Sequence, residues 1–281
     1  MSEKNSVSKE LKEKLFSKKK NGIFRMNDAE LKSCDEFSES YKSFLNAAKT
    51  EREAVEQSVE LLKQKGFKEY TIGMKLSAGD KIYRINRGKA VIAAIIGSEP
   101  IESGVRLCSA HIDSPRLDLK QFPLNEDSEM ALFKTHYYGG IKKYQWTAIP
   151  LSLHGVIIKS DNSSVKVNIG EDENDPVFCV TDLLPHLATE QMKRNLAQGI
   201  KGEELNIVVG SRPFKDDEAS EAVKLNILNI LNEKYGIIED DFISAELEAV
   251  PAFKSKDIGF DRSMIGSYGH DDRVCAYTAL S

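Results

Sequence analysis

His111 and Asp113 stand two residues apart at the end of an apolar run, within the segment SAHIDSPRLDLK (residues 109–120). Side chains two apart in an extended chain point to the same side, so both can face one site. A carboxylate beside a histidine often takes the proton of one ring nitrogen, which leaves the other nitrogen to bind a metal. The pair therefore predicts either part of a metal site or an ordinary His–Asp hydrogen bond.

A second chemically active pair, Asp271 and Asp272, lies in SYGHDDRVCAYTAL, after a glycine-containing loop and at the start of a predicted helix. Carboxylates are favourable at a helix N-terminus, where they cap backbone amides and interact with the helix dipole. They are also common metal ligands. The two acids by themselves leave both interpretations open.

The elements before His111 are predicted from periodicity and capping. Residues 50–67 form a helix, because Thr50 and Glu53 make a capping box and Gly66 ends it. Residues 80–98 give two strands joined by a turn at 86–88. Residues 104–113, continuously apolar before His111, are predicted as a buried strand that delivers the histidine to the end of a sheet.

Beyond Lys120 the pattern changes to short strands separated by turn signals, which indicates a β-rich domain. Residues 205–211 add a strand. Residues 216–236 are predicted as an amphipathic helix with acids in its first turn and Gly236 at its end. Residues 241–251 return as a strand before the segment that contains Asp272.

Bulk composition limits the function classes. A chain of 281 residues has room for two domains, or for one domain with a large insertion. Its net charge of −5, with no strand that combines basic and aromatic residues, disfavours nucleic acid and an anionic membrane as partners. No secretory signal or membrane-spanning run is found, and four scattered cysteines fit reduced thiols. A cytoplasmic location is therefore predicted.

Four segments in order resemble the aspartyl aminopeptidase family of dinuclear metallopeptidases, in its bacterial branch. SAHIDSPRLDLK and GHDDRVCAYTAL are similar to the first two metal-binding segments of the family. YYGGIKKYQW followed by PLSLHGVIIK resembles its Gly-Gly…Trp segment, and LLPHLA resembles its Pro-His-Leu-Ala segment. The similarity runs from about Tyr41 to the last residue.

The resemblance implies a site with two metal ions, usually zinc, with cobalt or manganese left open. His111 matches the histidine ligand of one metal, Asp113 the acid that orients this histidine, and Asp272 the carboxylate that bridges the metals. Asp271 receives no role. The family has Asn after the bridging Asp, where this chain has Arg273, so the local geometry departs from the family pattern.

The resemblance also implies an α/β fold in which a metallopeptidase α/β sandwich domain, incomplete here, is interrupted by a β-rich dimerisation domain. The expected boundaries are 1–120 for the first part of the metallopeptidase domain, 121–252 for the insertion and 253–281 for the continuation. The family forms homo-oligomers through the β-rich domain and assembles into dodecamers. Glu190 stands where eukaryotic relatives place a histidine that reaches a neighbour's active site, which leaves a preference for acidic residues open.

The function implied is that of a zinc-dependent aminopeptidase, in which a hydroxide bridging two metals attacks the N-terminal peptide bond. The family's remaining residues, a Glu–Glu pair, an Asp and a final His, follow the bridging Asp. They are missing from these 281 residues, so the chain alone is expected to be inactive. The alternative from another class is a non-catalytic oligomeric subunit or binding module derived from the family.

Overall fold

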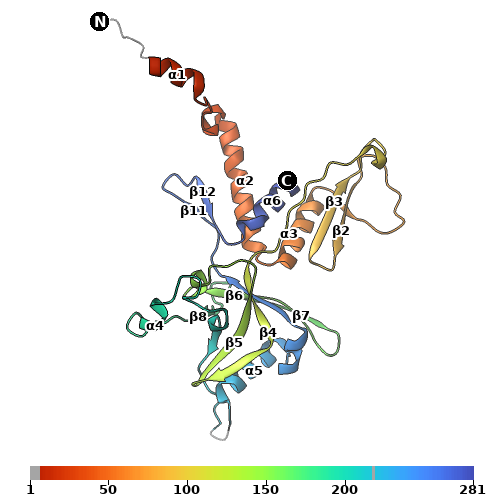
Figure 1. The fold of residues 1–281 in the computed structure, drawn as a ribbon. Coiled ribbons are helices and arrows are strands. Elements are labelled where there is room, and N and C mark those ends of the chain that lie inside the picture. The colour runs from red at the N-terminus through yellow and green to blue at the C-terminus, as the bar shows by residue number, and fades with distance from the viewer. Residues whose placement is uncertain (1–6, 217–218) are drawn as a thin grey trace. The chain divides into compact units, whose positions relative to one another are not determined.

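The fold was analysed in a computed structural model, which describes residues 7–216 and 219–281 (Figure 1). The chain divides into two compact units, residues 1–41 and 42–281. Helix α1 (Val7–Leu15), a 3-10 turn (Gly22–Arg25) and most of α2 (Asp28–Ala47) belong to the first unit. In the described ranges, no helix is both long enough and apolar enough to cross a membrane.

The second unit begins with α3 (Glu51–Gln64), which confirms the predicted helix and its capping box between Thr50 and Glu53. A three-stranded sheet follows in the order β1 (Lys68–Glu69), β2 (Lys81–Asn86) and β3 (Ala90–Ile95). The predicted pair of strands around the turn at 86–88 is confirmed. Apolar side chains of α3 and of the sheet form a small core, made of Val55, Val59, Leu62 and Tyr83.

A seven-stranded sheet with antiparallel neighbours forms the body of the second unit, in the order β7-β6-β10-β4-β5-β9-β8. Its main hairpin is β4–β5, which stands out in Figure 1 as two long strands. The strands are β4 (Arg116–Asp127), β5 (Met130–Tyr138), β6 (Leu151–Ile158), β7 (Ser164–Ile169), β8 (Cys179–Val180), β9 (Ile207–Gly210) and β10 (Glu246–Pro251). The sheet carries the largest apolar core of the unit.

The other α-helices and strands of the described residues are α4 (Thr189–Met192), α5 (Ala222–Tyr235), the hairpin of β11 (Lys256–Ile258) and β12 (Met264–Gly266), and α6 (His270–Leu280). Four 3-10 helices lie between these elements, at Ile101–Ser103, Lys143–Trp146, Gly202–Glu204 and Glu239–Ser244. Helix α5 packs on the seven-stranded sheet and ends at Gly236 in the left-handed conformation, as predicted. Its start was predicted wrongly: the helix begins at Ala222 and not near residue 216, so its first turn contains no acid. Residues 217–218 of that acidic stretch lie outside the described residues.

The strand predicted over residues 104–113 is wrong: this segment has no regular secondary structure. Val105 and Leu107 are 70% and 81% exposed, although an apolar run of this kind is typical of a strand buried on both faces. A strand gains its stability from neighbours that satisfy its backbone groups. Within the described part of the chain, no strand pairs with residues 104–113.

Candidate metal site

His111 and Asp113 lie together just before β4, as their spacing predicts. The Nδ1 atom of His111 is 3.0 Å from the carbonyl oxygen of Asp113 and 3.3 Å from its carboxylate Oδ1. Burial opposes protonation of His111, but the Asp113 carbonyl and the nearby carboxylates outweigh it and raise the pKa of the imidazole. With its proton on Nδ1, the imidazole presents the lone pair of Nε2 on its other side.

Asp271 is the carboxylate that faces His111. Its Oδ1 atom is 3.1 Å from His111 Nε2, and its side chain is 92% exposed. The hydroxyl of Ser114 donates a 2.8 Å hydrogen bond to the carbonyl of Asp271, which joins the two segments. Asp272 interacts instead with the Cys275 thiol, whose pKa this hydrogen bond raises. Asp272 is still close enough for its charge to help raise the pKa of His111.

The two acids lie in an irregular backbone stretch at the start of α6, and their side chains have different partners. Asp271 and Asp272 have non-helical dihedral angles, and the peptide bond between them is cis. The α6 segment therefore starts with an irregular stretch before its regular helix. Both acids belong to this stretch, and the helix N-cap is Gly269, which has no side chain to cap with.

Arg273 holds the irregular stretch in place. Its side chain is almost fully buried, with Nε donating to the Ile112 carbonyl at 3.1 Å and Nη2 donating to the Lys49 carbonyl at 3.0 Å. Gly269 has φ +89°, and a Cβ there would lie 2.2 Å from Arg273 Nη1. Arg273 thus ties the segment of Asp271 to the segment of His111.

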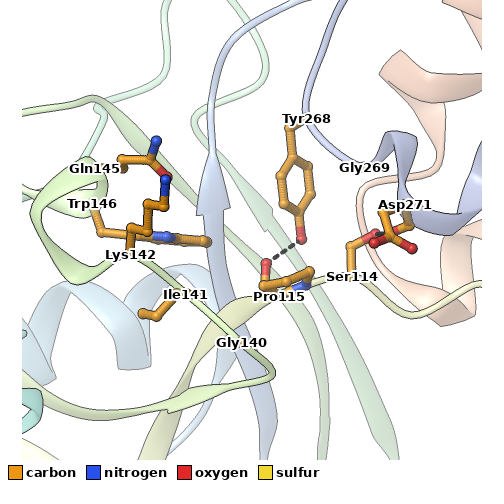
Figure 2. Close-up of a pocket in the computed structure, with 10 residues that line it drawn as sticks. All are labelled: Ser114, Pro115, Gly140, Ile141, Lys142, Gln145, Trp146, Tyr268, Gly269 and Asp271. Carbon is orange, nitrogen blue, oxygen red and sulfur yellow. Dashed lines mark hydrogen bonds between the residues drawn. The ribbon is translucent and has the colours of Figure 1, made fainter. Parts of the chain in front are cut away.

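A cavity of about 390 Å³ opens beside Asp271 (Figure 2). The loop after β5 contributes the cation of Lys142, the amide of Gln145 and the ring of Trp146, and Tyr268 stands opposite. The Tyr268 hydroxyl donates a 2.9 Å hydrogen bond to the Pro115 carbonyl. The cavity therefore combines apolar walls with a cation, an amide and a carboxylate at its edge.

The sequence profile of the aminopeptidase I zinc metalloproteases (M18) matches residues 44–281. The chain belongs to this family. The family resemblance found in the four sequence segments is thereby confirmed.

Two M18 relatives agree, and a further solved structure shows the same fold. The probable M18 family aminopeptidase 1 of Clostridium acetobutylicum is 51% identical over 270 residues, which cover 95% of this chain and 58% of that protein. The crystal structure of the M18 aminopeptidase from Thermotoga maritima matches with a TM-score of 0.88 and 45% identity, over 94% of this chain and 57% of that one. A structure of the S. cerevisiae mApe1 dodecamer matches with a TM-score of 0.65 and 19% identity, over 88% and 55% of the two chains.

These matches confirm the mixed α/β class and show that the chain spans little more than half the length of the relatives. The donor types fit the family's zinc, because an imidazole nitrogen and a carboxylate oxygen face each other at 3.1 Å. Within residues 7–216 and 219–281, no group of three or more His, Cys, Asp or Glu side chains is arranged to hold a metal ion.

The other residues singled out from the sequence lie elsewhere. Glu190, on α4, makes a 2.5 Å ion pair with Lys193, the residue just after that helix, and His186 is exposed in the loop before it. Sequence reasoning assigned no role to Asp271 and did not consider Tyr138, whose hydroxyl donates to Asp113 at 2.7 Å. The tyrosine lies in the quoted segment YYGG, but its type and position alone gave no sign of this contact.

Beside this site, Glu248 is buried at the centre of a charged cluster. Its neighbours are Arg116, whose Nε is 3.3 Å from Glu248 Oε2, together with Glu51, Asp118 and Lys89. Burial and the negative charge of Glu51 raise the pKa of Glu248 to about 8, while Arg116 opposes this shift. Glu248 therefore takes up a proton in the folded state at a pH where the unfolded chain has already lost it.

We expect this proton to make the stability depend on pH. Between the ordinary pKa of 4.5 and about 8, the folded state binds more protons, so the free energy of unfolding falls as pH rises and levels off above 8. Glu248→Gln should remove this fall, which amounts to about 1.4 kcal/mol for each pH unit inside the window. Urea unfolding from pH 5 to 9 measures it, with Glu173→Gln in an exposed loop as control. An equal fall in wild type and Glu248→Gln would contradict the assignment.

Proposed function

We propose that the natural protein containing this chain is a zinc-dependent aminopeptidase, which removes N-terminal residues from peptides. The contact of His111 Nε2 with Asp271 Oδ1 is the observation that supports it most, because it joins the family's first two metal-binding segments in space. Family membership and relatives named as aminopeptidases support the same class of hydrolase.

In this proposal His111 and the acidic pair 271–272 supply metal ligands. We assign the ligand carboxylate to Asp271, because Asp271 and not Asp272 contacts His111 Nε2. The assignment of Asp272 made from the sequence stays the competing proposal. Two ions, with zinc as the family's metal and cobalt or manganese as possible substitutes, belong to the proposal as well.

In the proposed chemistry, the metal and the residues of the chain have different roles. Bound zinc supplies Lewis acidity, which polarises a peptide carbonyl and lowers the pKa of water. Asp113 would keep the proton of His111 on Nδ1, so that the lone pair of Nε2 is free to bind a metal ion held together with Asp271. The cavity beside Asp271 offers the peptide an apolar wall at Trp146 and a cation at Lys142 (Figure 2).

Domain roles and assembly are further parts of the proposal. We assign residues 121–252 to an inserted β-rich domain through which copies of the protein form a homo-oligomer. The S. cerevisiae relative was solved as a dodecamer, which supports oligomerisation in a protein of the same fold. A cytoplasmic location is proposed from the sequence, on its composition and four scattered cysteines. The family resemblance leaves a preference for acidic N-terminal residues open.

Peptide hydrolysis by the natural protein, expressed with every residue that its gene encodes, tests the proposed activity. Peptides that begin with Glu, Asp, Leu or Lys should lose their first residue, and their N-acetylated forms should stay intact. A chelator should abolish the reaction, and added zinc should restore it because the metal is required for the chemistry. Cobalt and manganese are compared in the same assay.

Two outcomes would contradict the proposal. Cleavage of the acetylated peptides at the same rate would mean that no free α-amino group is required, so the enzyme is no aminopeptidase. Full activity after exhaustive chelation and dialysis would exclude a metal-dependent reaction. The ranking of the four N-terminal residues decides the acidic preference separately.

A further inference from the structure

Tyr138 connects the seven-stranded sheet with the candidate metal site. It is the last residue of β5 and pairs across the hairpin with Arg116, the first residue of β4. Its hydroxyl donates a 2.7 Å hydrogen bond to Oδ2 of Asp113. The tyrosine thus reaches from the sheet to the acid that contacts His111.

The two carboxylate oxygens of Asp113 have different partners. Oδ2 accepts from Tyr138, whereas Oδ1 lies 3.3 Å from His111 Nδ1. Because both oxygens are engaged, the carboxylate plane is fixed with respect to the imidazole.

The tyrosine ring is itself held in place. The guanidinium carbon of Arg116 lies 4.1 Å from the ring centroid, a cation–π contact. Arg116 is buried, and its Nε donates to Asp118 at 2.7 Å, with Glu248 at 3.3 Å. A ring stacked on an arginine that is fixed in this way presents its hydroxyl to Asp113 in one direction.

We propose that Tyr138 is a positioning residue for the metal site, which acts through Asp113 to hold His111 with Nε2 directed at the metal. The inference rests on the proposed function, because it assumes that His111 binds the metal. Without the hydroxyl, Oδ2 of Asp113 loses its partner and the carboxylate can rotate away from Nδ1. His111 then loses the neighbour that fixes its orientation and its tautomer.

Zinc affinity of the natural full-length protein measures this role, by competition with a chromophoric chelator. Tyr138→Phe keeps the ring over Arg116 and removes only the hydroxyl, so zinc affinity should fall about 10- to 100-fold. Tyr137→Phe is the matched control, because the Tyr137 hydroxyl makes no hydrogen bond within the described residues. Its affinity should equal that of wild type.

Two further readouts separate positioning from a loss of structure. The metal-free forms of wild type and Tyr138→Phe should unfold at the same temperature, whereas a merely structural tyrosine would lower it. Asp113→Ala should weaken zinc binding, and adding Tyr138→Phe to it should weaken it no further, because both act through one contact.

Zinc binding by Tyr138→Phe as tight as by wild type would overturn the inference, and so would full additivity with Asp113→Ala. A wild-type protein that binds zinc but hydrolyses no peptide would refute the proposed function and leave the role of Tyr138 standing. A wild-type protein that binds no zinc would refute both.

Discussion

The 281-residue chain, supplied with zinc, is expected to hydrolyse no peptide, whereas the natural full-length protein is expected to be active. A catalytic zinc site usually takes three protein ligands and leaves one position for water. In the described part of the chain, the site brings together His111 and Asp271, and no group of three candidate ligands occurs. All of the measurable peptide hydrolysis should therefore come from the full-length protein, and none from the 281-residue chain.

The comparison needs both proteins in one assay, with the same peptide and the same zinc concentration. Circular dichroism of the 281-residue chain shows whether it is folded, so that inactivity is not simply misfolding. His111→Ala in the full-length protein is the control that connects its activity with this site. Zinc-dependent hydrolysis by the short chain, at a rate near that of the full-length protein, would contradict the prediction.

Local sequence signals located the elements that depend on neighbouring residues. The capping box at Thr50 and Glu53, the turn at 86–88 and the left-handed Gly236 each require contacts within a few residues only. Propensity and capping act at this range, so the bounds of α3 and of the β2–β3 hairpin could be predicted.

Strands and contacts that depend on residues far apart in the sequence were not predicted correctly. Residues 104–113 have the composition of a buried strand. A strand also requires a neighbouring strand to pair with, and amino-acid composition does not show whether one is present. The β4–β5 hairpin was not predicted, and with it the approach of Tyr138 to Asp113 was missed. This contact joins residues 25 positions apart, and its geometry depends on the register of the hairpin.

In the candidate site, too, the contact between residues close in sequence was predicted, whereas the choice between two adjacent acids was not. His111 and Asp113 are two residues apart, and their side chains lie together as predicted, although the segment forms no strand. The choice between Asp271 and Asp272 depends on backbone dihedral angles at the start of α6, which are non-helical at both residues. Two adjacent acids are equivalent in composition, and only the folded backbone shows which of them faces His111.

Asp271→Asn is expected to have the largest effect of any single substitution at the acidic pair. Amide replacement keeps the size of the side chain but removes the charge that a cation requires. If Asp271 is the ligand, the loss of about 4 kcal/mol of transition-state stabilisation lowers kcat/KM about a thousandfold. Asp272→Asn should keep zinc bound and lower kcat/KM about tenfold, because Asp272 acts on His111 only through its charge.

The two variants of the full-length protein control for each other, since they differ by one position along the same irregular stretch. Zinc content by mass spectrometry and kcat/KM for one peptide are measured in both. The reverse ranking would make Asp272 the ligand, as the family resemblance implied, and Asp271 its neighbour. Equal losses would mean that both carboxylates are needed, so that the pair and not one acid binds the metal. The expected ranking follows from one contact, the 3.1 Å approach of Asp271 to His111 Nε2.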